Sequence, residues 1–129
     1  MPPKSKKQKA SYKMSQEWLE AIDKDEENKN LWDQVKSKES ANKKELLEYI
    51  EELFCCIICQ DIAFQPITTS CHHNFCKGCM LMSFQASDDP KKKICPSCRH
   101  DLGEKYKLDV NTNLKDALNL MFPGYEAGR

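Results

Sequence analysis

The sequence predicts a small zinc-stabilised α+β domain with flanking α-helices, and three observations support this fold class. The chain has 129 residues, which is one domain of modest size with room for only a small hydrophobic core. Its 8 cysteines are many for that length, and most of them stand in close pairs of the kind that bind zinc. Apolar residues on both sides of the cysteine-rich segment recur at helical spacing.

Charge and hydropathy exclude two classes of protein. The 20 basic and 20 acidic residues cancel, and no basic stripe crosses the cysteine-rich part, so we expect no direct nucleic-acid binding. No apolar run approaches the roughly 18 residues of a membrane span, and the N-terminus lacks the apolar stretch of a secretory signal. We therefore expect no membrane partner and a reducing intracellular compartment, where cysteines bind metal rather than form disulfides.

The N-terminal part divides by charge. Residues 1–13 carry five lysines and no acid, which predicts a disordered basic tail. Its lysine cluster is compatible with a nuclear import signal, but a solvated terminus is the more common reason for such a cluster. Residues 14–53 carry twelve acids and six lysines, and we expect them to form a helical region.

Three apolar stripes define that helical region. Ser15 stands before Trp18 and Ile22 as an N-cap residue would. The second stripe is centred on Trp32, and residues 36–44 form a polar connection after it. The third stripe runs along one helical face up to Phe54. We interpret all three stripes as packing surface rather than ligand sites.

Residues 54–102 contain four pairs of metal-ligand residues. The short spacing within each pair lets two side chains reach one zinc ion. Eight ligands suffice for two closed structural sites without a vacant position, which disfavours metallohydrolase chemistry. Spacing alone leaves the pairing of the pairs open. The candidate ligands are Cys56 and Cys59, Cys71 and His73, Cys76 and Cys79, and Cys95 and Cys98.

The last part, residues 103–129, is predicted to be a polar link followed by a helix. Its apolar residues recur from Val110 to Met121 at helical spacing, with Asn111 or Asn113 as the cap. The Pro123-Gly124 dipeptide ends the helix.

Seven cysteines with histidine as the fourth ligand resemble a RING finger. This resemblance implies a cross-braced fold, in which the first and third pairs share one zinc and the second and fourth pairs share the other. Neighbouring sequence is similar to the C-terminal RING region of the UHRF family of ubiquitin ligases. The similar segments are Phe54-Cys-Cys-Ile-Ile-Cys-Gln-Asp, Gln65-Pro-Ile-Thr-Thr, His73-Asn-Phe-Cys-Lys-Gly-Cys, Cys95-Pro-Ser-Cys-Arg-His-Asp-Leu-Gly103 and Phe122-Pro-Gly-Tyr.

The resemblance also implies a function. A RING-type E3 ubiquitin ligase module binds a ubiquitin-loaded conjugating enzyme and promotes transfer of ubiquitin to a substrate lysine, with no covalent intermediate of its own. By this likeness Ile57, Pro96 and Ser83 contact the conjugating enzyme, and Arg99 is the catalytic cation that bridges enzyme and ubiquitin. The likeness extends to a histone substrate and a nuclear location. The alternative is a RING that serves only as an assembly platform or heterodimer partner.

Several residues of the cysteine-rich part are surplus to this interpretation. We interpret Cys55 as a small buried thiol rather than a nucleophile, because no base stands beside it in the sequence. His72 is an alternative to His73 as ligand, although the resemblance favours His73. His100 is expected at the surface or in packing. The charged segment 88–93 reads as a solvated insertion, with a substrate-docking patch as the other interpretation.

Overall fold

A computed structural model describes residues 12–38, 40–89 and 91–128, so the predicted lysine cluster of the tail lies outside the described residues. The helices are α2 (Gln16–Lys24), η1 (Glu26–Asn28), α3 (Lys29–Lys36), α4 (Lys43–Leu53), α5 (Lys77–Gln85), α6 (Thr112–Met121) and η2 (Tyr125–Gly128). The strands are β1 (Cys55–Cys56), β2 (Asp61–Ile62), β3 (Pro66–Thr68) and β4 (Asn74–Cys76). In the described part, no helix combines the length and apolar character needed to cross a membrane.

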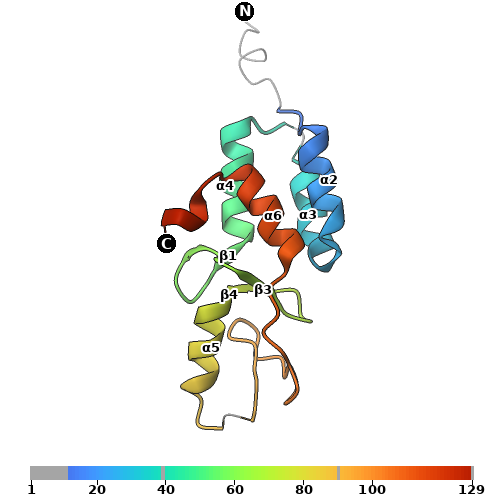
Figure 1. Cartoon of the computed structure of the whole chain (residues 1–129). Coiled ribbons are helices and arrows are strands. Elements are labelled where there is room, and N and C mark those ends of the chain that lie inside the picture. Colours follow the sequence, from blue (N-terminus) through green and yellow to red (C-terminus); the bar gives the residue numbers. More distant parts are fainter. Residues whose placement is uncertain (1–11, 39, 90, 129) are drawn as a thin grey trace, which may run out of the picture.

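These elements confirm the predicted α+β class and fall into two parts. Figure 1 shows α2, α3, α4 and α6 together at one end of the molecule, and α5 with the long connecting loops at the other. The short strands lie between the two parts and form two antiparallel ribbons, β1 with β2 and β3 with β4. The chain leaves the helical end after α4, builds the cysteine-rich end, and returns to the helices through α6.

Side-chain caps begin three of the helices. The Ser15 hydroxyl accepts a hydrogen bond from the Trp18 backbone N–H at 3.1 Å, which confirms the cap predicted there. Asn42 and Glu45 form a reciprocal capping box at the start of α4. Of the two asparagines considered for α6, Asn111 is the cap, because its side-chain oxygen accepts from the Leu114 N–H at 3.1 Å.

The three predicted apolar stripes and α6 share one core. Trp32 of α3 stacks near Phe54, with ring centroids 4.5 Å apart, and α6 packs chiefly against α2. Ile62 of β2 also belongs to this core, so the helical part and the first ribbon are joined by packing. Tyr12, which the charge pattern placed in the tail, lies 5.4 Å from Trp18 between ring centroids. The helices are therefore a structural base for the cysteine-rich part.

Shortening a core side chain of α6 should lower the stability of the whole fold. Leu118 is fully buried in the core that α6 shares with α2, α3, α4 and Ile62. Leu118→Ala should cost about 2 to 5 kcal/mol of unfolding free energy, because lost burial and a residual cavity both contribute. The measurement is chemical denaturation, with the exposed Asp116→Ala on the same helix as control. Equal stability of the two variants would contradict this packing.

A buried polar network joins the helices to the second ribbon. The Asp25 carboxylate is 1% exposed and accepts hydrogen bonds from the side-chain nitrogens of Asn28 at 3.0 Å, Trp32 at 2.9 Å and Asn111 at 2.8 Å. Asn28 in turn donates to the Thr68 hydroxyl at 3.1 Å. Within the described residues, every buried side-chain nitrogen or oxygen has a hydrogen-bond partner. A carboxylate buried without a cation tolerates the interior when several donors satisfy it.

The network continues to the residue that follows the histidine ligand. Asn74 donates to the Asn28 side-chain oxygen at 2.8 Å and accepts from the Thr68 hydroxyl at 2.6 Å. Asn74 is adjacent to His73 in the chain, and Thr68 is adjacent to Thr69. The helical base thus holds the loop that carries the second cysteine pair in a defined position.

Candidate metal centres and the adjoining surface

Two clusters of metal-ligand side chains lie in the cysteine-rich part, and each draws on two pairs that are not consecutive in the sequence. In each cluster the candidate ligand atoms lie within 4.8 Å of one another. The first contains Cys56, Cys59, Cys76 and Cys79, and the second contains Cys71, His73, Cys95 and Cys98. The interleaved pairing implied by the resemblance is confirmed.

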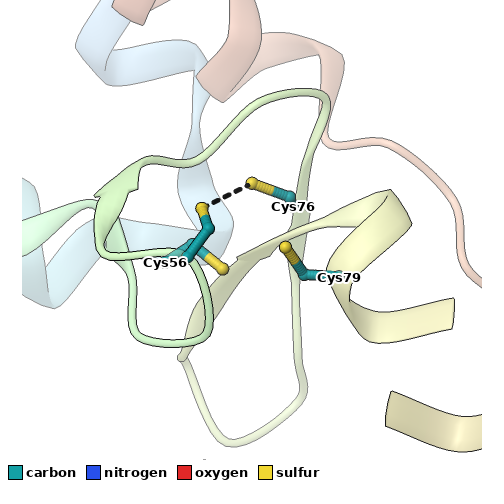
Figure 2. A group of neighbouring side chains, drawn as sticks. Cys56, Cys76 and Cys79 are labelled. Atoms are coloured by element: carbon teal, nitrogen blue, oxygen red, sulfur yellow. Dashed lines mark hydrogen bonds between the residues drawn. The ribbon is translucent and has the colours of Figure 1, made fainter. Parts of the chain in front are cut away.

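The local fold brings the first cluster together. Cys56 lies on β1, Cys76 ends β4, and Cys79 follows in the first turn of α5. Figure 2 shows the sulfur atoms of Cys56, Cys76 and Cys79 directed toward one another. The Phe64 backbone N–H donates to the Cys76 sulfur at 3.1 Å, as amides commonly do to thiolate ligands.

Two ligands of the second cluster, Cys71 and His73, lie in the loop between β3 and β4. The Thr69 hydroxyl lies 3.0 Å from the Cys71 sulfur and also accepts from the His73 backbone N–H at 3.0 Å. The Thr69 N–H donates to the His73 carbonyl at 2.9 Å, which closes the loop. Thr69 therefore orients two ligands of this cluster at once, a role of the kind that outer hydrogen bonds have at metal sites.

The distances fit zinc. With Zn–S bonds of about 2.3 Å, two sulfurs of a tetrahedral site lie about 3.8 Å apart, and a sulfur and an imidazole nitrogen lie about 3.6 Å apart. The Cys59 and Cys76 sulfurs are 3.6 Å apart, and the Cys95 sulfur is 3.6 Å from His73 Nδ1. Each cluster supplies four ligands, so a bound zinc ion would have a closed coordination shell.

Thiols packed this closely favour a bound cation. The pKa values of the Cys71 and Cys79 thiols are raised to about 11, chiefly by burial and also by the neighbouring sulfurs. Thiolates are the form that binds zinc, and a divalent ion offsets the cost of placing several of them side by side. The donor set and its electrostatics therefore both point to structural metal.

The first cysteine pair, Cys56 and Cys59, and the last pair, Cys95 and Cys98, each lie in a tight knuckle, and the two knuckles have the same type of backbone turn. The N–H of Gln60 donates to the Cys56 carbonyl at 2.7 Å, and that of Arg99 donates to the Cys95 carbonyl at 2.8 Å. Both residues have a left-handed backbone, with φ of 61° and 65°. Such a conformation costs a non-glycine residue about 1 kcal/mol or more and persists where the surroundings determine it. The knuckle thus sets the position from which the Arg99 side chain departs.

Three of the four residues assigned by resemblance to ubiquitin transfer line one cavity. Ser83 of α5, Pro96 of the last knuckle and Arg99 surround a cavity of about 290 Å³ between α5 and that knuckle. The residues Phe84, Ser87, Lys92, Ile94 and Cys95 complete its lining. Sequence reasoning did not single out Ser87 or Lys92 for this surface.

Ile57 lies elsewhere. It lines a smaller cavity of about 170 Å³ on the helical side, where Leu31 of α3, Leu53 of α4 and His72 are its neighbours. Ser97 lines the same cavity, so the last knuckle separates Ile57 from the cavity that contains Arg99. Ile57 is 51% exposed and the adjacent Ile58 is 42% exposed. The structure therefore does not bring Ile57 together with Ser83, Pro96 and Arg99 in one cavity.

Cys55, His72 and His100, which the RING interpretation left without a role, are not part of either metal cluster. Burial raises the pKa of Cys55, whose thiol lies 3.6 Å from the Cys56 carbonyl, and this disfavours a thiolate nucleophile. His73 is the ligand, and His72 places Nδ1 3.1 Å from the Glu27 carbonyl of η1. His100 is exposed, as expected.

Comparison with known proteins agrees with this geometry. Residues 56–98 match the family model described as zinc finger, C3HC4 type (RING finger). The chain is 47% identical over 119 residues to "E3 ubiquitin-protein ligase UHRF1" of Xenopus tropicalis, an alignment that covers 92% of this chain and 15% of that protein. It is 40% identical over 121 residues to the human "E3 ubiquitin-protein ligase UHRF2", covering 92% of this chain and 14% of that protein.

A more distant relative matches a shorter part. The yeast "RING finger protein PSH1" is 39% identical over 79 residues, which is 61% of this chain and 19% of that protein. The chain spans about 15% of the length of the curated UHRF relatives described above. The two clusters match the two structural zinc sites of a RING finger.

Proposed function

Because residues 56–98 belong to the C3HC4 RING finger family, we propose that this chain is the ligase module of a RING-type E3 ubiquitin ligase. It binds a ubiquitin-conjugating enzyme and promotes transfer of ubiquitin from the enzyme's thioester to a substrate lysine. The observation that carries this proposal is the cavity beside the second zinc cluster, where Ser83, Pro96 and Arg99 meet. The names of the UHRF relatives support the same activity.

The chain's part in the reaction is binding and positioning. Two bound zinc ions supply structural cross-links, since both clusters offer four protein ligands and leave no position for a water molecule. The substrate amine attacks the thioester carbonyl, and the thiol of the conjugating enzyme is the leaving group. This chain holds the thioester in a reactive orientation and excludes unproductive ones, which lowers the entropic part of the barrier.

Arg99 is the residue that we place at the reacting partners. Its guanidinium is exposed and makes no salt bridge among the described residues. A planar group with five donors can bond to two proteins at once, which suits a bridge between conjugating enzyme and ubiquitin. Hydrogen bonds formed mainly as charge develops on the thioester oxygen accelerate the transfer itself.

The exposed isoleucines of the first knuckle supply the apolar contact in this proposal. Exposed apolar side chains that stand together mark interaction surfaces in soluble domains. Ile57 is the residue that the resemblance assigns to the conjugating enzyme, while Ile58 is its exposed neighbour on the same short turn. Ile57 lines the cavity on the helical side and Ile58 does not, so the contact can be tested one side chain at a time.

Truncating Ile57 should weaken binding of the conjugating enzyme. Loss of an apolar anchor in a small interface costs about 1 to 3 kcal/mol, so the dissociation constant should rise severalfold or more. The measurement is a titration of the chain with a panel of unloaded conjugating enzymes, with Ile58→Ala as the matched comparison. A larger loss for Ile58→Ala would move the contact to that residue. A wild-type chain that binds no enzyme of the panel would contradict the proposed function.

The substrate and location complete the proposal. The likeness to UHRF ligases points to a histone lysine as acceptor and to the nucleus as the compartment. The lysine cluster Lys4, Lys6, Lys7 and Lys9 is compatible with import.

A further inference from the structure

The cavity that contains Arg99 is lined by apolar, hydroxyl and cationic side chains. Its apolar lining consists of Phe84 of α5 together with Ile94 and Pro96 near the last zinc pair. The rest is polar, with the hydroxyls of Ser83 and Ser87 and the cationic side chains of Lys92 and Arg99. None of the described residues that line it is acidic. The cavity therefore combines hydrogen-bond donors with unbalanced positive charge beside an apolar surface.

Neither cation of the cavity is neutralised within the described part of the chain. The salt bridges there join Lys29 to Asp33 and Lys36 to Asp23, both on the helical base. Lys92 and Arg99 are both exposed, and the apolar side chains beside them exclude part of the surrounding water, which strengthens their attraction for an incoming anion. The site is thus complementary to a carboxylate brought by a partner.

The segment that carries Lys92 is held in place by its own hydrogen bonds. Asp89 organises its turn, since its carbonyl accepts from the Lys92 N–H at 2.9 Å and its carboxylate accepts from the Lys91 N–H at 3.1 Å. The Lys93 carbonyl accepts from the Leu102 N–H at 2.8 Å, which ties the segment to the end of the zinc-binding part.

Three successive lysines consequently have three different surroundings. Lys91 is exposed and lines no part of the cavity. Lys92 is also exposed, but it lines the cavity. Lys93 is half-buried, and its ammonium donates to the Tyr106 carbonyl at 3.1 Å. The segment that the sequence presents as a uniform charged insertion therefore directs one particular lysine to the surface assigned to the conjugating enzyme.

We propose that this cavity receives an acidic side chain of the conjugating enzyme and that Lys92 selects among conjugating enzymes by that charge. This inference rests on the proposed function and specifies its partner. Ser83 is small, which leaves room for the incoming side chain, and its hydroxyl can donate to the carboxylate beside Lys92. Conjugating enzymes with a carboxylate on the loops that face the RING finger bind best, and those with a lysine or arginine there are rejected by like-charge repulsion.

The test compares two charge reversals that differ by one position. Lys92→Glu and Lys91→Glu change the net charge equally, but only the first alters the cavity. Each variant is titrated with the panel of conjugating enzymes at low and at high salt. Lys92→Glu should weaken the enzyme preferred by the wild type roughly five- to tenfold at low salt and less at high salt, while Lys91→Glu changes it less than twofold.

A charge swap on the partner identifies the contact. Replacing the carboxylate of the preferred enzyme by lysine should weaken binding to the wild type and restore binding to Lys92→Glu. Zinc content and melting temperature of both variants establish that they are folded, and Lys92→Gln serves where the reversal itself destabilises the segment. The inference is overturned if the two reversals have equal effects, or if the preferred enzyme carries no carboxylate on its RING-facing loops. If the wild type binds no conjugating enzyme, the proposed function fails as well.

Discussion

Chelating zinc should abolish the tertiary structure of the cysteine-rich part and weaken the helical base with it. The separate core of this part has only seven buried residues, and three of them are the metal ligands Cys56, Cys76 and Cys95. Such a core cannot offset the entropy of ordering the chain, whereas structural zinc contributes about 10 to 16 kcal/mol in small zinc-binding peptides near pH 7. The effect should reach the helices because Phe54 and Ile62 lie in their core.

The measurement combines elemental analysis with circular dichroism during titration by a chelator. We expect two zinc ions per folded chain and a large loss of near-ultraviolet signal as they are removed. Cys55→Ser is the matched control and should keep both ions, while Cys59→Ser and His73→Ala should each lose one. One ion per wild-type chain, or a fold indifferent to the chelator, would contradict the assignment of two four-ligand clusters.

Replacing Arg99 by alanine should slow ubiquitin discharge much more than it weakens binding of the unloaded conjugating enzyme. A hydrogen bond from a charged group contributes about 1.5 to 3 kcal/mol, which corresponds to a rate loss of roughly ten- to a hundredfold. Arg99→Lys should restore only part of the rate, because a single ammonium group cannot reproduce the planar guanidinium, which presents donors to two partners at once. Alanine and lysine carry a Cβ atom as arginine does, so all three residues meet the same cost of the left-handed backbone at this position.

The readout is the first-order rate of discharge from a loaded conjugating enzyme to free lysine. His100→Ala is the matched control, since His100 is the exposed neighbour and does not line the cavity. An equal loss of binding and rate in Arg99→Ala would assign Arg99 to ground-state binding instead.

Local patterns in the sequence predicted much of this fold. Ser15 and Asn111 have the residue types and positions of helix caps, and the structure uses both. The metal ligands were predictable because zinc chemistry restricts residue type and spacing at once. Their pairing required the resemblance, since a run of four pairs is consistent with more than one topology.

Buried hydrogen bonds between residues far apart in the chain could not be predicted from the sequence. Asp25, Asn28 and Asn111 look like ordinary surface residues in the sequence, yet they are buried and bonded across 40 to 86 residues. Nothing in their immediate neighbours distinguishes a satisfied buried amide from a solvated one. The same holds for Lys91 to Lys93, whose separate surroundings follow from a turn that propensity does not specify.

The different surroundings of two adjacent side chains on a tight turn also could not be predicted from the local sequence. Ile57 and Ile58 are identical in type, adjacent and both exposed. Ile57 lines the cavity on the helical side, and Ile58 does not line it. The two residues can be distinguished only in the folded structure of the knuckle.

Single-turnover discharge tests the central claim most directly. A conjugating enzyme is loaded with ubiquitin, freed of the activating enzyme, and mixed with free lysine in the presence or absence of the wild-type chain. The reaction contains no substrate protein, and no polyubiquitin is formed. The rate therefore reports whether this protein activates the thioester. The account predicts a discharge rate at least tenfold above that of the loaded enzyme alone, dependent on zinc and on Arg99. A chain that binds the loaded enzyme and leaves its discharge rate unchanged would be an assembly platform and would contradict the account.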